Sequence, residues 1–336
     1  MENLGVTPEF WAGKRVFLTG HTGFKGSWLA LWLTTLGAEV TGYSLAPNTE
    51  PNHFDALHLG DKITSIIGDI RDLAHLKKSM ADANPDVVFH LAAQPLVRES
   101  FENPLETYEI NVMGTANVLE SVRGCSNVRS VVVITTDKVY ENREWEWGYR
   151  EIDPLGGFDP YSNSKACTEL VTSSYTQSFF NAAEYDKHGV AIASARAGNV
   201  FGGADWAKDR LIPDLIRAHD AGVPPVIRYP GSVRPWQHVL EPLRGYLFLA
   251  RALFEHGPAY NGGFNFGPRE TDAQNVKTIC EIVAGILGDS GTWVMDDAIN
   301  PHEAGYLKLD ISKAKAVLGW EPKTNLQQGL EMATEW

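Results

Sequence analysis

The chain has 336 residues, of which 29 are lysine or arginine and 42 are aspartate or glutamate, so its formal net charge is −13. A chain this acidic is on average a poor binder of polyanions, and a phosphorylated ligand needs a locally basic or dipole-lined pocket. With 43% hydrophobic residues, the chain is too apolar for wholesale disorder and long enough for one large α/β unit or two coupled lobes.

Neither a membrane span nor a secretory leader is predicted. No apolar run approaches the roughly 20 residues that cross a bilayer, and the N-terminal stretch MENLGVTPEFW has neither a basic nor an apolar region. The three cysteines lie far apart and outside any metal-ligand spacing, which favours a reducing compartment. We therefore expect a cytoplasmic protein without a metal site.

Strand-like and helix-like segments alternate up to residue 200. Short apolar runs predict strands at residues 15–19, 39–43, 65–67, 86–91, 130–135 and 191–195. Helical spacing predicts helices at residues 28–36, 73–80 (with Asp72 as the N-cap), 104–122 and 162–180. Several strands are almost wholly apolar, as expected when helices cover both faces of a sheet. The pattern predicts an α/β fold built on a doubly wound parallel sheet of the Rossmann type.

Beyond residue 200 the alternation breaks and prolines cluster, which indicates a smaller, mixed C-terminal substrate lobe. A helix at 240–254 and a strand at 263–266 are still predicted, and a helix capped by Ser312 runs to Leu318 and ends at Gly319. The predicted dinucleotide-binding domain comprises residues 11–200 and 237–267. The predicted substrate lobe comprises residues 201–236 and 268–336.

A glycine-rich turn, TGHTGFKG, joins the first strand to the first helix. Gly20 suits the tight turn, Gly23 lets the backbone approach a pyrophosphate, and Gly26 lets the helix pack against the strand. The helix N-terminus then offers N–H groups and a partial positive charge to the phosphates. The alternative is a turn that binds no ligand. We assign to a dinucleotide site the residues Gly20, Thr22, Gly23, Phe24, Lys25 and Gly26.

The end of the second strand leaves the choice between NAD and NADP open. The stretch TGYS at residues 41–44 supplies neither a carboxylate for the adenosine ribose nor an arginine for a 2′-phosphate. After the third strand, Asp69 is placed to hydrogen-bond the adenine and Ile70 to pack against it. Asp69 is explained equally well as a turn residue or helix cap.

Tyr161 and Lys165 lie one helical turn apart and share a helix face. The pKa of free tyrosine is ~10, so a tyrosinate base at neutral pH needs that pKa lowered by about three pH units, roughly 4 kcal/mol. A neighbouring ammonium together with a positively charged nicotinamide can supply this effect. The pair is typical of a base that takes a proton from a hydroxyl group while hydride leaves for a cofactor. The alternative is an ordinary exposed Tyr/Lys pair.

These residues together resemble the extended short-chain dehydrogenase/reductase family, over nearly the whole chain. The motifs that carry the resemblance are TGHTGFKG, GDIRD at 68–72, HLAAQ at 90–94, NVMGT at 111–115, YSNSK at 161–165 and RAGNVFG at 196–202. The stretches HTGFKGSWL, TTDKVYEN and RPWQHVLEPLRGYL point within the family to nucleotide-sugar 4,6-dehydratases, and most closely to those that act on CDP-glucose.

The resemblance implies an internal redox cycle in a step of deoxysugar biosynthesis of the O-antigen type. Tyr161 would accept the O4 proton, Thr136 would bond the O4 region, Lys165 would hold the nicotinamide ribose, and Asp137 would protonate the leaving C6 hydroxyl. Lys138 stands where relatives that act on dTDP-glucose carry a glutamate base. It would serve as the C5 base, orient Asp137 or stabilise a C5 enolate. The alternative for Asp137 and Lys138 is a solvated loop ion pair.

The resemblance also implies further ligand contacts and an oligomer. Leu91, Ala92 and Ala93 would line the cofactor site. Substrate contacts would come from Gln94, Thr136, Asn199 and Arg234, with Arg234 gripping phosphate through its guanidinium fork. Arg210 and Arg217 are chosen as further substrate contacts because a diphosphate needs cations from the second lobe. Tyr306 would close the pocket, or is equally well explained as a surface loop tyrosine. The helices at 104–122 and 162–180 would pair with a second copy in a four-helix bundle, giving a homodimer or a tetramer.

Two other functions remain open at this stage. A nucleotide-sugar 4-epimerase would share the glycine turn and the Tyr161/Lys165 pair but needs no acid–base pair beside Thr136. A non-catalytic dinucleotide- or RNA-binding member of the fold would show no turnover of any sugar nucleotide. The net charge of −13 and the intact Tyr161/Lys165 pair weigh against this reading.

Overall fold

The structure is a computed structural model that describes residues 5–298 and 303–336. Its centre is a 7-stranded sheet with the strand order β11-β6-β5-β4-β1-β2-β3, and every neighbouring pair is parallel. The strands are β1 (Arg15–Thr19), β2 (Glu39–Ser44), β3 (Thr64–Ile67), β4 (Val87–His90), β5 (Ser130–Ile134), β6 (Ala191–Ala197) and β11 (Gly262–Phe266). The predicted doubly wound parallel sheet is confirmed.

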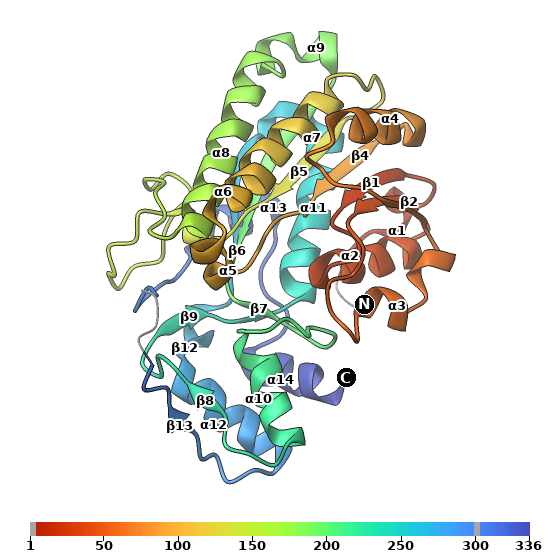
Figure 1. The fold of residues 1–336 in the computed structure, drawn as a ribbon. Helices are drawn as coiled ribbons and strands as arrows, with labels where there is room; N and C mark the ends of the chain where they lie inside the picture. The colour runs from red at the N-terminus through yellow and green to blue at the C-terminus, as the bar shows by residue number, and fades with distance from the viewer. Residues whose placement is uncertain (1–4, 299–302) are drawn as a thin grey trace.

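Helices cover both faces of this sheet, as Figure 1 shows. One apolar cluster joins the sheet to α2 (Phe24–Thr35) and α11 (Leu240–His256). A second cluster on the other face joins it to α4 (Leu73–Ala83) and α7 (Gly114–Val122), with α8 (Pro160–Ser178) packed alongside. The strands β4, β5 and β6 are buried along their whole length because both faces are covered.

The predicted helix boundaries need three corrections. The helix predicted at 104–122 is divided by a π-helical turn at Glu109–Met113, which separates α6 (Pro104–Tyr108) from α7. The helix predicted from residue 162 begins at Pro160, because the Asp159 side chain caps it by accepting from the Ser162 amide. Ser312 is not a cap but the first residue of α13 (Ser312–Leu318), and Asp310 accepts from its amide at 2.8 Å.

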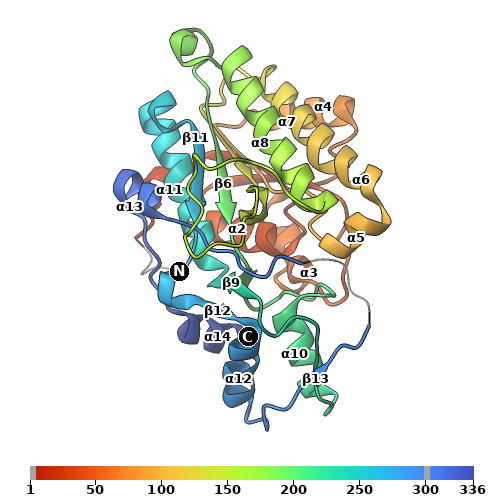
Figure 2. The ribbon, with the colours of Figure 1, turned by 90° about the vertical axis from the view of Figure 1, so that its left-hand side faces the viewer.

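The smaller lobe has its own apolar cluster, formed with α10 (Leu211–Asp220), α12 (Val276–Leu287) and α14 (Leu326–Glu335). Two short strand pairs complete it, namely β9 (Val233–Pro235) with β12 (Ala273–Asn275) and β8 (Val226–Ile227) with β13 (Val294–Met295). Figure 2 shows these elements gathered below the sheet. The pair of β7 (Val200–Phe201) and β10 (Gln237–His238) lies between the two parts.

One segment predicted for the smaller lobe packs elsewhere. Ala314 of α13 and Trp320 belong to the buried cluster of the large sheet. The remaining short helices are α1 (Pro8–Trp11), α3 (His53–Ala56), α5 (Val97–Glu102) and α9 (Tyr185–His188). Within the described residues, we find no helix with the length and apolar character that crossing a membrane requires.

Candidate active site

A cavity of about 1070 Å³ lies where the large sheet meets the smaller lobe. Its lining includes Thr136, Asp137 and Lys138 just after β5, Asn199 just after β6, and Tyr161 in the first turn of α8. Open parallel sheets bind ligands beyond the carboxyl ends of their strands, which is where these residues lie. The cavity is therefore the candidate active site.

The glycine turn at one side of the cavity leaves room for a dinucleotide. Gly20 has a φ of 77°, and a Cβ there would lie 2.7 Å from the Ala92 amide nitrogen. A Cβ on Gly26 would overlap the Gly20 carbonyl oxygen, so the helix can approach the strand only without one. Gly23 caps the start of α2 without a side-chain hydrogen bond, so the first amides of the helix stay available to a phosphate. The residues present fit a dinucleotide cofactor.

The other predicted cofactor residues lie around this turn, and some of them line the cavity whereas others bond to the protein itself. Phe24 and Lys25 line the cavity, and burial lowers the pKa of Lys25 to about 8. The Thr22 hydroxyl is hydrogen-bonded within 3 Å to Ser44 and the Leu45 carbonyl, so it holds the end of β2. Leu91, Ala92 and Ala93 follow β4, and the chain at Leu91 and Ala92 contacts Gly20.

Asp69 and Ile70 follow β3, as predicted, but the Asp69 carboxylate already has a partner. It forms an ion pair with the Arg71 guanidinium at 2.6 Å, which lowers the pKa of Asp69. Ile70 is buried, and its side chain lies against Gly114. The adenine contacts of these two residues stay a prediction.

Tyr161 and Lys165 are both buried beside the end of β5, so the alternative of an exposed pair is wrong. The Lys165 Nζ donates to the Ile134 carbonyl at 3.1 Å. Burial lowers the pKa of Lys165 to about 7, and the nearby Lys25 lowers it further, whereas Glu169 raises it. Lys165 is therefore close to half-protonated at neutral pH.

The expected acidification of Tyr161 is not supplied by the protein groups alone. Burial raises the pKa of Tyr161 to about 12, and a hydrogen bond with Thr136 only partly opposes this effect. The reason is that desolvation and the nearby Asp137 and Asp159 disfavour the phenolate more strongly than Thr136 and the Arg210 charge favour it. Further positive charge in the cavity is required before Tyr161 can act as a base.

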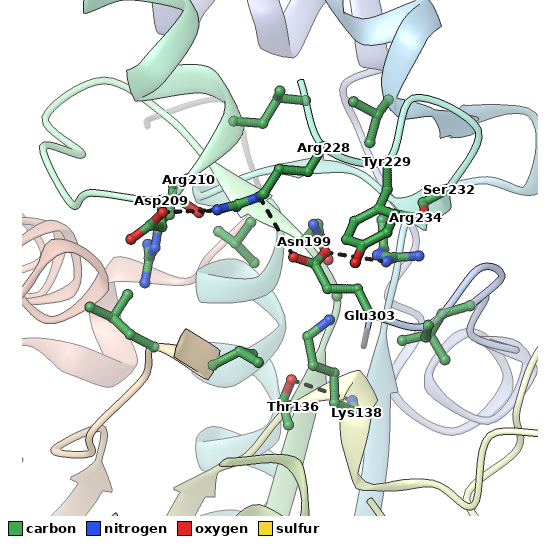
Figure 3. Close-up of a pocket in the computed structure, with 18 of the residues that line it drawn as sticks. Thr136, Lys138, Asn199, Asp209, Arg210, Arg228, Tyr229, Ser232, Arg234 and Glu303 are labelled. Carbon is green, nitrogen blue, oxygen red and sulfur yellow. Dashed lines mark hydrogen bonds and ion pairs between the residues drawn. The ribbon is translucent and has the colours of Figure 1, made fainter. Parts of the chain in front are cut away.

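Asp137 is a buried group rather than a solvated loop residue, since only 1% of it is exposed. Its Oδ1 accepts from the Thr136 hydroxyl at 2.9 Å. Its Oδ2 is buried, and no described residue donates a hydrogen bond to it. Figure 3 shows Thr136 and Lys138 together at one side of the cavity, with the Lys138 ammonium extending into it. A buried carboxylate with one unsatisfied oxygen is suited to proton transfer with a bound ligand.

Two of the three predicted substrate arginines reach the cavity. Arg234 is buried on β9 and lines the cavity. Arg210 also lines the cavity, and it forms an ion pair with Asp205 at 2.8 Å. Arg217 lies on α10 outside the lining, where it bonds the Asp214 carboxylate and the Ala207 carbonyl. Its side chain is turned toward these partners, and its contact with substrate stays a prediction.

Gln94 and Tyr306 also lie outside the cavity lining, and their substrate contacts stay a prediction. The Gln94 carboxamide holds its own loop by donating to the Leu96 carbonyl and to Thr107, both at 3.0 Å. The Tyr306 ring lies 5.2 Å from the Lys308 ammonium. Both side chains are engaged in local contacts that motif position does not reveal.

Arg228 is a cavity residue that sequence reasoning missed. It pairs with Asp209 at 2.9 Å, and its Nε lies 3.9 Å from Glu303. Glu303 also lies 3.8 Å from the Arg234 guanidinium, so it stands between the two arginines, as Figure 3 shows. The only available signal was that Arg228 lies in the same proline-rich stretch as Arg234. Two guanidiniums separated by one carboxylate suit a doubly charged phosphate group.

Among the described residues, no group of three or more histidine, cysteine or carboxylate side chains is arranged to hold a metal ion. His90 is buried between the Thr19 and Thr115 hydroxyls at 2.8 and 3.0 Å. Burial lowers its pKa to about 3, so it is neutral. His90 therefore contributes packing and hydrogen bonds rather than charge.

Comparison with known proteins adds three findings. The family model described as GDP-mannose 4,6 dehydratase matches residues 17–333. The CDP-glucose 4,6-dehydratase of Salmonella typhimurium is 55% identical over 331 residues, which cover 98% of this chain and 92% of that protein. A probable dTDP-glucose 4,6-dehydratase of Sinorhizobium fredii is 26% identical over 340 residues, covering 96% of this chain and 92% of that protein.

Solved structures agree on the fold. MoeE5 in complex with UDP-glucose and NAD superposes with a TM-score of 0.80 at 25% identity, covering 96% of this chain and 97% of that chain. A UDP-glucose 4-epimerase of Thermotoga maritima with UDP-glucose gives a TM-score of 0.82 at 22% identity, covering 95% and 97%. This second likeness concerns the fold alone.

We predict that Arg228→Ala weakens binding of a nucleoside diphosphate by about tenfold or more, because a charge-assisted hydrogen bond contributes roughly 1.5–3 kcal/mol. Arg217→Ala is the matched control and should change the dissociation constant by less than about twofold. Isothermal titration of CDP, UDP and dTDP measures both variants. Equal losses in the two variants would show that the cavity arginine has no special role.

Proposed function

Because the chain belongs to the family described by the GDP-mannose 4,6 dehydratase model, we propose that it is an NAD-dependent nucleotide-sugar 4,6-dehydratase, a hydro-lyase. Its substrate is CDP-D-glucose and its products are CDP-4-keto-6-deoxy-D-glucose and water. The observation that carries this proposal is the 55% sequence identity to the Salmonella typhimurium enzyme, which extends over 98% of this chain. The reaction is a step of deoxysugar biosynthesis.

The glycine turn supports NAD as the cofactor. Gly20 and Gly26 let the turn pack closely against the chain after β4 and against the start of α2, and the uncapped start of α2 suits a pyrophosphate. When bound, NAD supplies the hydride acceptor and donor that a redox-neutral dehydration needs. Lys165, one helical turn beyond Tyr161, would hold the nicotinamide ribose through its ammonium.

Each step is assigned to a group that faces the cavity. Tyr161 accepts the O4 proton, and Thr136 lies beside it in the cavity. Asp137 protonates the departing C6 hydroxyl through Oδ2, which has no competing donor among the described residues. Lys138 serves the C5 position as base or as counter-ion to the enolate. Arg228 and Arg234 bind the diphosphate, and Asn199 and Arg210 complete the substrate contacts.

The buried Asp137 favours dehydration over 4-epimerisation. An epimerase returns hydride to the carbon from which it came and has no leaving hydroxyl to protonate. A carboxylate buried in the cavity with an unsatisfied oxygen has no role in that reaction, and its desolvation carries a free-energy penalty.

The proposal is tested by incubating the chain and NAD with CDP-glucose, dTDP-glucose and GDP-mannose. We expect a base-labile 4-keto-6-deoxy product from CDP-glucose, with kcat/KM at least about 100-fold above the other two. Tyr161→Phe should lower kcat by roughly 10²–10⁴-fold while keeping the fold, since a general base contributes about that factor. A C4 epimer as the product, or equal rates with all three sugars, would refute the proposal.

We predict that Asp137→Asn allows oxidation at C4 but slows elimination. The amide cannot deliver a proton to the leaving oxygen, so release of deoxy-ketosugar should fall by roughly 10²–10⁴-fold. Single-turnover analysis by mass spectrometry distinguishes the 4-keto sugar from the 4-keto-6-deoxy sugar. Asp82→Asn, which only breaks a surface pair with Lys78, is the control and should turn over at the normal rate. Rapid loss of water in Asp137→Asn would show that another group is the acid.

We propose a homodimer through the helices α6, α7 and α8, which lie side by side in Figure 1. Large apolar side chains are exposed on or next to them, with Leu105 78%, Met113 57% and Leu170 58% exposed. Pairing with a second copy would bury this apolar surface. We also propose a cytoplasmic location, which the three free cysteines support.

The dimer proposal predicts that Leu170→Glu gives a monomer. A charge on α8 would have to be buried in the helix bundle, which disfavours association. Sedimentation velocity should show the loss of dimer in this variant and its retention in Val317→Glu, which changes an exposed apolar residue on α13. A dimer that persists in Leu170→Glu would place the interface elsewhere.

A further inference from the structure

We propose that Glu169 is a positioning residue, which locks both ends of the segment 135–140 and places a carboxylate one helical turn from Lys165. The segment carries Thr136, Asp137 and Lys138, and the inference rests on the dehydratase function proposed for them. Glu169 lies one helical turn after Lys165 on α8, behind the cavity rather than in its lining. It therefore acts through other residues.

The Glu169 carboxylate is buried and fully engaged. Its Oε1 accepts from the Thr135 hydroxyl at 2.6 Å and from the Arg196 Nε at 2.8 Å. Its Oε2 accepts from the Ser194 hydroxyl at 2.5 Å and from the Arg196 Nη2 at 2.9 Å. One side chain thus joins α8 to the end of β5 and to β6. Every partner of the Glu169 carboxylate is a hydrogen-bond donor. In a Glu169→Gln variant, the amide N–H group would therefore face another donor.

Arg196 extends this connection to the far end of the catalytic segment. Its Nη1 donates to the Tyr140 hydroxyl at 2.8 Å, and that hydroxyl donates to the Asn265 Oδ1 at 2.7 Å. The Tyr140 ring also stacks on Tyr149 with the ring centroids 5.1 Å apart. The chain from Glu169 through Arg196 therefore fixes Tyr140, while Glu169 itself fixes Thr135.

The catalytic residues lie between these two fixed points. Asp137–Val139 forms a short 3₁₀ turn, and Thr136 begins it by accepting from the Lys138 amide. Figure 3 shows Thr136 and Lys138 at the edge of the cavity. A turn this short has few hydrogen bonds of its own, so its orientation depends on what holds its ends. Displacement of catalytic groups by about 1 Å can lower a rate by about 10²-fold.

Glu169 also acts on Lys165 through its charge. Burial lowers the pKa of Lys165 to about 7, Lys25 lowers it further, and Glu169 opposes both effects. The other titratable neighbours of Lys165 are uncharged at neutral pH. Tyr161 is a neutral phenol, and His90 is a neutral imidazole because its pKa is lowered to about 3. On the far side of the carboxylate, Lys313 and Arg196 are cations.

The sign of the resulting pH dependence follows directly. Lys165 is protonated below its pKa, so a function that needs its ammonium is lost as the pH rises through about 7. Removing the Glu169 charge lowers this pKa further, by about one unit, because an opposite charge nearby shifts a pKa by roughly one to three units. The alkaline limb of activity should move to lower pH by the same amount. A purely structural role predicts no such movement.

A buried pair elsewhere provides the matched control. Glu241 on α11 is as buried as Glu169, pairs with Arg244 at 3.6 Å and accepts from the amides of Lys323 and Thr324. These three partners lie outside the segment 135–140. Glu241→Gln should therefore lower the melting temperature without moving the pH limb.

The experiment compares Glu169→Gln, Glu169→Asp and Glu241→Gln in the full chain. Steady-state kinetics with CDP-glucose and fluorescence titration of NADH are both measured from pH 6 to 9, and melting temperatures are recorded. For Glu169→Gln we expect kcat to fall by about 10–100-fold with KM within about threefold, and both pH midpoints to move down by about one unit. Glu169→Asp keeps the charge but retracts the carboxylate, so it should lower kcat while leaving the midpoints in place.

The outcomes separate this inference from the proposed function. If the unaltered chain turns over no nucleotide sugar but NADH binding still shows the shifted midpoint in Glu169→Gln, the proposed function fails and the Lys165 effect stands. The inference is overturned if Glu169→Gln folds but its pH midpoints do not move. It is also overturned if Glu169→Gln and Glu241→Gln lose activity in the same proportion to the fall in their melting temperatures. If Glu169→Gln does not fold, Glu169→Asp decides the positioning role by its kcat.

Discussion

Desolvation of ionisable groups at the end of β5 is the constraint on which this site depends. Tyr161, Lys165 and Asp137 are all removed from water, and burial disfavours the charged forms of Tyr161 and Lys165. The effect is large enough to bring the pKa of Lys165 to about 7 and that of Tyr161 to about 12. The chain alone therefore holds a phenol and a partly neutral amine. The charge of the loaded cavity decides when proton transfer becomes possible.

The helix α8 combines several tasks because its faces meet different surroundings. Asp159 caps its start, which fixes the turn that carries Tyr161. Lys165 follows on the face toward β5, and Glu169 continues that face into the buried contact with Arg196. Leu170 lies on the exposed surface of the same helix. The proposed cofactor contact, the position of the loop after β5 and the proposed interface with a second copy are thereby linked through one helix.

The proposed diphosphate site of this acidic chain depends on cations that are concentrated rather than numerous. Arg210, Arg228 and Arg234 come from different parts of the smaller lobe and meet in one cavity. Each is held by a carboxylate, with Glu303 between Arg228 and Arg234. The carboxylates keep the guanidiniums in place and limit their repulsion.

The sequence by itself determined the parallel sheet, the glycine turn and the Tyr161/Lys165 pair, because these follow from local periodicity and from spacing along one strand or helix. It did not determine which lobe residues face the ligand. In the smaller lobe, Arg217 and Tyr306 turn to local partners, whereas Arg228 lines the cavity although the sequence analysis did not select it. Side-chain direction and desolvation arise only when distant segments pack together. The tertiary structure therefore decided how deeply Tyr161 and Lys165 are buried and which arginines line the cavity.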